Sequence, residues 1–82
     1  MEPFSPNDEI SGLAQLARQL RARRRLIKLT QTELAGLAGV GLRFVSDLEN
    51  ARPGLEIGRV FRVAETLGLE IALRPRDWPS AR

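Results

Sequence analysis

The chain has 82 residues and a formal net charge of +3, and it contains no cysteine and no histidine. This length allows one small domain, and the missing residue types exclude disulfides, thiolate metal sites, the usual zinc ligand sets and histidine-based acid–base catalysis. No apolar run reaches membrane-spanning length and the N-terminus lacks a signal-peptide pattern, so we expect a cytoplasmic protein.

The first predicted helix follows a flexible N-terminal segment, residues 1–7. The helix begins either near Asp8, because Pro6 and an acidic first turn favour a helix start, or near Ser11, because Gly12 weakens the earlier turn. Its predicted inward face consists of Leu13, Leu16, Ala17, Leu20, Arg24 and Ile27.

Every charged residue between residues 10 and 32 is basic. A solvated charged face is one interpretation of this run, and contact with DNA phosphates is the other. The second interpretation gains weight if DNA-binding helices follow, and Arg21 and Arg23 are then the candidates for phosphate contact. The basic residues are Arg18, Arg21, Arg23, Arg24, Arg25 and Lys28.

The next predicted helix begins after Thr30, which forms a capping-box pattern with Glu33. Thr30 and Gln31 stand where free backbone N–H groups and the helix dipole favour a phosphate group. The inward face is expected to contain Leu34, Leu37 and Ala38. Gly39 ends this helix, with a positive φ expected there, and Val40 then enters the core.

A second short helix is predicted over residues 41–49, with Val45 and Leu48 facing inward and Phe44 packed at the edge of the core. Two helices joined by a glycine-containing turn make a helix-turn-helix, whose second helix enters the major groove of DNA.

Four side chains of this second helix are expected to face outward. Arg43 can donate to guanine O6 and N7, and Leu42 can contact a thymine methyl group. Ser46 can contact a base or a phosphate. Asp47 either accepts a hydrogen bond from a cytosine amino group or orients Arg43, four residues earlier.

Beyond the loop at residues 51–54, a further helix is predicted over residues 56–67 and ends before Gly68. We expect its inward stripe to contain Ile57, Val60, Phe61, Ala64 and Leu67.

After residue 68 the apolar residues recur at every second position, which predicts a strand with Leu69, Ile71 and Leu73 on one face. The strand is expected to pair with the same strand of a second copy, or else with a different protein. In the tail, residues 75–82, Trp78 either folds back onto the domain or is exposed as an anchor for a partner.

Three segments resemble the Xre/Cro-type helix-turn-helix repressors: Gln-Thr-Glu-Leu-Ala at 31–35, Ala-Gly-Val-Gly at 38–41 and Val-Ser-Asp-Leu-Glu-Asn at 45–50. The resemblance covers about residues 16–74, and residues 57–75 are similar to HipB-type antitoxins. It implies an all-α, lambda-repressor-like domain of four to five helices over residues 8–74, with one C-terminal β-strand pairing across a homodimer. Gly41 departs from the family, which usually has Ser or Thr there.

The resemblance also implies particular residue roles. The Gln31 amide would contact the DNA backbone, and Arg24 would pair with Glu49 and lock the first helix to the third. Without that pair, Arg24 would extend to solvent.

At the level of function, the resemblance implies a homodimeric, nucleoid-associated repressor of a palindromic operator, without cofactor or enzymatic activity. It also implies an antitoxin that restrains a HipA-like kinase toxin, a partner that Trp78 would contact if it is exposed rather than folded back onto the domain. A stand-alone phage or restriction-system regulator and a protein-interaction module without specific DNA binding are the alternatives.

Overall fold

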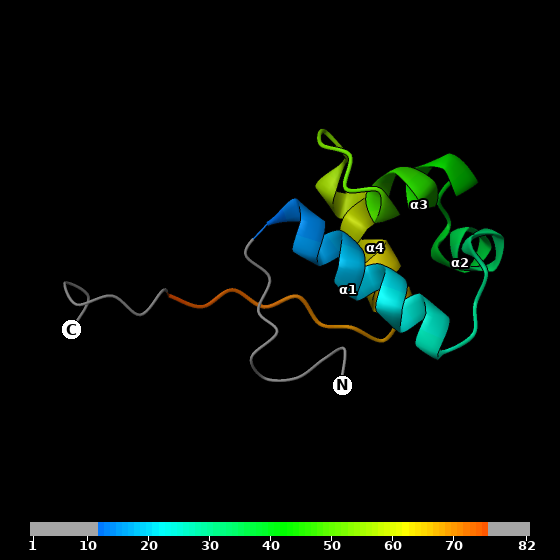
Figure 1. Cartoon of the computed structure of the whole chain (residues 1–82), viewed down its shortest axis with the longest axis horizontal. Helices are drawn as coiled ribbons and strands as arrows, with labels where there is room; N and C mark the ends of the chain where they lie inside the picture. Colours follow the sequence, from blue (N-terminus) through cyan, green and yellow to red (C-terminus); the bar gives the residue numbers. More distant parts are fainter. Residues whose placement is uncertain (1–11, 76–82) are drawn as a thin grey trace.

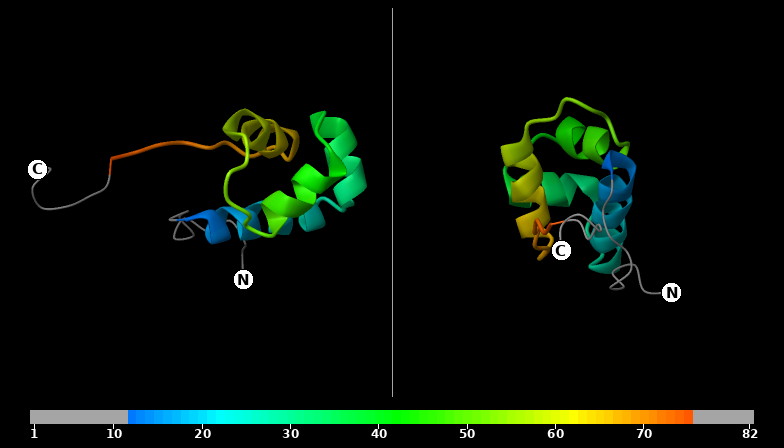
Figure 2. Two further views of the ribbon diagram at one scale, coloured as in Figure 1. Left: turned by 90° about the horizontal axis from the view of Figure 1, so that it is seen from above. Right: turned by 90° about the vertical axis from the view of Figure 1, so that its left-hand side faces the viewer.

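The computed structural model describes residues 12–75, and this region contains four helices and no strand. None of these helices is long and apolar enough to cross a membrane. α2 packs against both α3 and α4, and α3 packs against α1 (Figures 1 and 2). The helices are α1 (Leu13–Leu26), α2 (Gln31–Ala38), α3 (Leu42–Glu49) and α4 (Ile57–Thr66).

α1 begins at Leu13, directly after Gly12, whose backbone is extended. This is close to the later of the two expected starts. The earlier start, near Asp8, lies outside the described residues, as does segment 1–7, which was expected to be flexible.

The predicted signals at both ends of α2 are confirmed. The Glu33 N–H donates to Thr30 Oγ1 at 3.0 Å, and the Thr30 N–H donates to Glu33 Oε1 at 2.8 Å. Gly39 ends the helix with φ of 71°, a conformation that glycine adopts without steric cost. Val40 follows, partly buried against the core. The turn that aims α3 is therefore specified locally.

The core receives side chains from all four helices. Val45 and Leu48 of α3 are fully buried, and Phe44 packs at the edge, as predicted. The buried cluster consists of Leu20, Leu34, Ala35, Ala38, Val45, Leu48, Val60, Val63, Ala64 and Leu67.

Four apolar residues expected to face inward are exposed instead. Leu37 is 67% exposed, because α2 turns the face of Leu34 and Ala38 toward the core. In α4 the buried stripe is centred on Val63, which was not among the residues expected to face inward. Because this stripe, and not the expected one, faces the core, the side chains of Ile57 and Phe61 are 62% and 43% exposed.

The fourth residue is Ile27, which is also exposed. It is the C-cap of α1 and lies one position beyond the last helical residue, so it no longer follows the face of the helix.

Beyond α4, Gly68 has φ of 75° and the chain leaves the helices as the segment 69–75 (Figure 1). Leu69 packs against the core, whereas Ile71 is partly exposed and Leu73 almost completely exposed. Since a strand needs a partner strand, the expected pairing between two copies stays a prediction. Trp78 and the rest of the tail after residue 75 lie outside the described residues.

Candidate nucleic-acid interface

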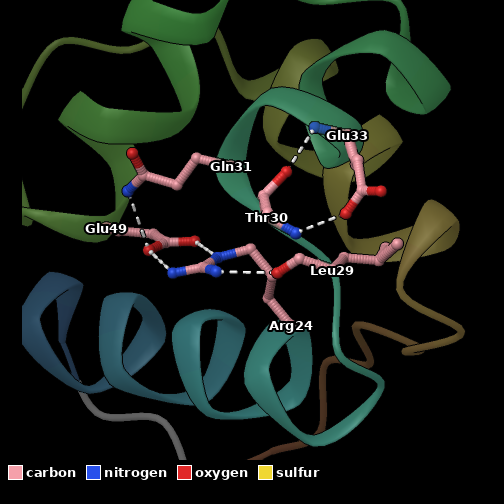
Figure 3. Close-up of polar contacts among 6 residues, drawn as sticks. All are labelled: Arg24, Leu29, Thr30, Gln31, Glu33 and Glu49. Carbon is pink, nitrogen blue, oxygen red and sulfur yellow. Dashed lines mark hydrogen bonds and ion pairs between the residues drawn. The ribbon is translucent and has the colours of Figure 1, made fainter.

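A buried ion pair joins α1 to α3, as predicted. Arg24 Nε and Nη2 donate to the two carboxylate oxygens of Glu49 at 2.7 and 2.9 Å, and Nη1 donates to the Leu29 carbonyl at 2.8 Å (Figure 3). Both side chains are almost completely buried. Every buried side-chain nitrogen or oxygen within residues 12–75 has a hydrogen-bond partner. The bidentate geometry fixes the end of α3 against α1.

Gln31 extends this network into α2. Its Nε2 donates to Glu49 Oε1 at 3.1 Å, so one carboxylate holds side chains from the first two helices (Figure 3). The predicted contact of the Gln31 amide with DNA backbone stays a prediction, and the structure adds that Glu49 orients this amide.

The network shifts the acidity of both charged partners. Burial alone would raise the pKa of Glu49, but hydrogen bonds from Arg24 and Gln31, together with the charges of Arg24 and Arg21, lower it below its ordinary value. The hydrogen bond to Glu49 raises the pKa of Arg24 despite its burial. Both groups are therefore charged at neutral pH.

The outer face of α3 presents the residues predicted to read bases. The Arg43 side chain is 88% exposed, and Leu42 is also exposed. Ser46 and Asp47 are half-buried on the same short helix. Gly41 at the N-cap supplies no side-chain hydrogen bond, as its departure from the family pattern implied. The first turn of α3 therefore lacks a side-chain cap from this residue.

Arg52, which was predicted only to lie in a loop, is also near this face. Its Nε lies 3.5 Å from Asp47 Oδ1, and Arg43 Nε lies 3.9 Å from Asp47 Oδ2. A basic residue shortly after the second helix was a usable signal, because it follows an acidic residue of that helix closely enough in sequence to form an ion pair with it.

The two basic residues of α1 chosen as phosphate contacts differ in their surroundings. Arg21 is exposed, and its charge helps to lower the pKa of Glu49, which places it near the α1–α3 contact. Arg23 Nε instead donates to the carbonyl of Leu67 at 2.7 Å and ties α1 to the end of α4. Both phosphate contacts stay predictions, and Arg23 has a structural role that was not foreseen.

Comparison with known proteins identifies the family. The family model for HTH_3, a helix-turn-helix domain, matches residues 20–73. The chain belongs to this helix-turn-helix family. An uncharacterized HTH-type transcriptional regulator, y4mF of Sinorhizobium fredii (strain NBRC 101917 / NGR234), is 48% identical over 58 residues. That match covers 71% of this chain and 76% of the relative.

The fold of the chain is also similar to solved structures. Chains in a HipA-HipB-O2-O3 complex and in a HipB-O4 20mer complex superimpose with a TM-score of 0.78 at 26% identity. Each match covers 90% of this chain and 100% of the solved chain. The resemblance to Xre/Cro-type proteins, and among them to HipB, is confirmed. The protein is a helix-turn-helix transcriptional regulator.

Proposed function

We propose that this regulator is a sequence-specific repressor that binds a palindromic operator as a homodimer and controls its own operon. The observation that carries the proposal is the placement of Arg43. It stands exposed on α3, while the opposite side of α3 is fixed by Val45, Leu48 and the Arg24–Glu49 pair. A rigid helix with an exposed arginine suits guanine recognition in the major groove.

The charge distribution supports DNA as the ligand. Arg18, Arg21 and Arg25 are exposed on α1, and the chain carries a net charge of +3. Exposed basic side chains beside a recognition helix neutralise phosphates and make binding sensitive to salt.

The exposed apolar side chains support a dimer. Ile57 and Phe61 lie on α4, and Ile71 and Leu73 lie on the segment that follows it. Pairing of segment 69–74 between two copies would cover part of this surface and supply the missing strand partner. Helix-turn-helix dimers bind two half-sites about one helical turn apart, which requires two recognition helices held in one assembly.

We further propose that the protein is a cytoplasmic antitoxin that binds a HipA-like kinase toxin. The support is the match along 90% of this chain to a chain of the solved HipA-HipB-O2-O3 complex. A second candidate is a regulator without a toxin. It is favoured by the relative from Sinorhizobium fredii, which is more similar in sequence, at 48% identity, and is named only as a transcriptional regulator.

A competitive DNA titration tests the repressor proposal. The wild type should prefer its own upstream DNA to random duplex of equal length, with an affinity that falls steeply as salt rises. Equal affinity for the two duplexes would refute specific repression and favour a protein-interaction module.

Co-purification with the product of the neighbouring open reading frame separates the two regulator candidates. A kinase-like partner that binds the full chain supports the antitoxin proposal, whereas a neighbouring frame without one supports the stand-alone regulator. Removing residues 75–82, which include Trp78, should then weaken toxin binding while operator affinity and dimerisation persist.

A further inference from the structure

We infer that Asp47 does not read a base itself but positions Arg43, and that Arg52 holds Asp47 in place for this purpose. The inference rests on the proposed function and deepens it, because it decides which side chains of α3 set the base preference.

Asp47 is enclosed by cations on both sides of its carboxylate. Its Oδ1 lies 3.5 Å from Arg52 Nε, and its Oδ2 lies 3.9 Å from Arg43 Nε. The Asp47 side chain is 25% exposed, whereas the Arg43 side chain is 88% exposed. A carboxylate that accepts a hydrogen bond from a cytosine amino group needs an oxygen that faces the groove. Here each oxygen instead lies within ion-pair distance of an arginine.

The orientation of Arg43 suits this division of roles. Its Nε lies 3.9 Å from Asp47 Oδ2, and the side chain that carries the two terminal nitrogens, Nη1 and Nη2, is 88% exposed. Two guanidinium N–H groups in a fixed fork match guanine O6 and N7. Holding the Nε edge limits the rotamers of Arg43 before DNA arrives, which favours one approach of the fork to the base.

The backbone after α3 accounts for the position of Arg52. Ala51 has φ of 58°, in the left-handed region, and turns the chain back toward α3. The Arg52 N–H then donates to the Asp47 carbonyl at 3.0 Å. Arg52 is therefore attached to Asp47 through its backbone as well as through its side chain. This attachment makes the loop part of the recognition surface.

A double-mutant cycle tests the inference with the full chain. Arg43→Ala, Asp47→Asn and the double variant are titrated against the upstream DNA and against its single-base-pair variants. Arg43→Ala should lower discrimination at one base pair per half-site about 5- to 150-fold, the range that corresponds to one bidentate contact. Asp47→Asn should lower discrimination at that same base pair roughly two- to fivefold, because exposed ion pairs are weak. The double variant should discriminate no less than Arg43→Ala alone.

Two matched controls separate positioning from net charge. Glu56→Gln also removes one negative charge from an exposed pair, since Glu56 Oε1 lies 3.8 Å from Arg59 Nε on α4. It should change affinity for all duplexes alike and leave the base preference unchanged. Arg52→Gln should lower discrimination at the same base pair as Asp47→Asn does. Arg59→Gln, which removes an equal charge, should not.

Each outcome decides the inference. If Asp47→Asn alters preference at a different base pair and its effect adds to that of Arg43→Ala, Asp47 reads a base and the inference is wrong while the repressor proposal stands. An unchanged preference in Asp47→Asn also refutes it. Uniform weakening by Arg52→Gln would make Arg52 a phosphate contact and refute its positioning role. A wild type that does not discriminate refutes both the proposed function and the inference.

Discussion

At the residue scale, the molecule depends on one charged side chain placed among apolar ones. Arg24 lies on the face of α1 that also buries Ala17 and Leu20. Burying a guanidinium group is costly unless its nitrogens find acceptors, and Glu49 and the Leu29 carbonyl accept one hydrogen bond from each of the three nitrogens. The same pair fixes α3, so the stability of the domain and the aim of its recognition helix depend on the same contacts.

Replacing Arg24 should therefore destabilise the fold strongly. We expect Arg24→Ala to lower the free energy of unfolding by about 3–5 kcal/mol, because it leaves the Glu49 carboxylate buried without its main partner. Chemical denaturation measures this change. Arg25→Ala removes the same charge from the next, exposed position and should change stability little. Equal effects of the two substitutions would contradict a structural role for the pair.

The lowered pKa of Glu49 predicts acid sensitivity. The folded state holds this carboxylate ionised more strongly than the unfolded state does, so its contribution to stability is complete above the ordinary pKa of 4.5. As the pH falls below that value and through the lower folded pKa, the contribution is lost. Denaturation midpoints should therefore drop over this interval in the wild type. In Glu49→Gln, which cannot titrate there, the same interval should show a smaller drop, and an unchanged drop would contradict the assignment to Glu49.

At the element scale, features that depend on neighbouring residues could be predicted from the sequence, whereas features that depend on packing between helices could not. The capping box at Thr30 and the turn at Gly39 depend on neighbouring residues, and they were predictable. The inward face of α4 depends on how α2 packs against it, so an apolar spacing that fitted Phe61 was wrong and Val63 was missed. The Arg23 contact with Leu67 joins positions separated by 44 residues, and no local pattern indicated it.

The loop between α3 and α4 gives a matched pair of tests at this scale. Ala51 has φ of 58° and Gly54 has φ of 81°, and both conformations favour glycine. Ala51→Gly should leave stability unchanged or raise it by up to about 1 kcal/mol, because relief of the left-handed strain offsets the greater entropy of an unfolded glycine. Gly54→Ala should lower stability by about 1 kcal/mol through backbone strain alone. Apart from Gly54 itself and its two chain neighbours, no atom of residues 12–75 lies within 4 Å of the added Cβ.

Thermal unfolding of both variants checks these signs. If Ala51→Gly destabilises the protein as much as Gly54→Ala does, the strain assigned to Ala51 is absent. Loss of base discrimination in Ala51→Gly without loss of stability would instead indicate that this turn holds Arg52 in place.

At the scale of the whole molecule, the segment after α4 is where we propose that one domain pairs with a second copy. After Gly68 the chain leaves the helices (Figure 2). Leu73, on the segment that follows, is 97% exposed. An extended apolar segment without a partner is unfavourable in water, and a copy of itself about a two-fold axis is the simplest partner. The alternation of Leu69, Ile71 and Leu73 indicated this from sequence, but only a second chain can supply the pairing.

Ile71→Asp tests this assembly. The substitution places a charge on the apolar face of the proposed intersubunit ribbon, and we expect sedimentation to show monomers at micromolar concentration. Operator binding should be lost with the dimer, because each half-site alone offers too few contacts. Phe61→Asp alters the exposed face of α4 in the same manner and serves as the matched variant. A dimer that persists in Ile71→Asp but dissociates in Phe61→Asp would place the interface on α4, since the charge is tolerated wherever no second copy covers it.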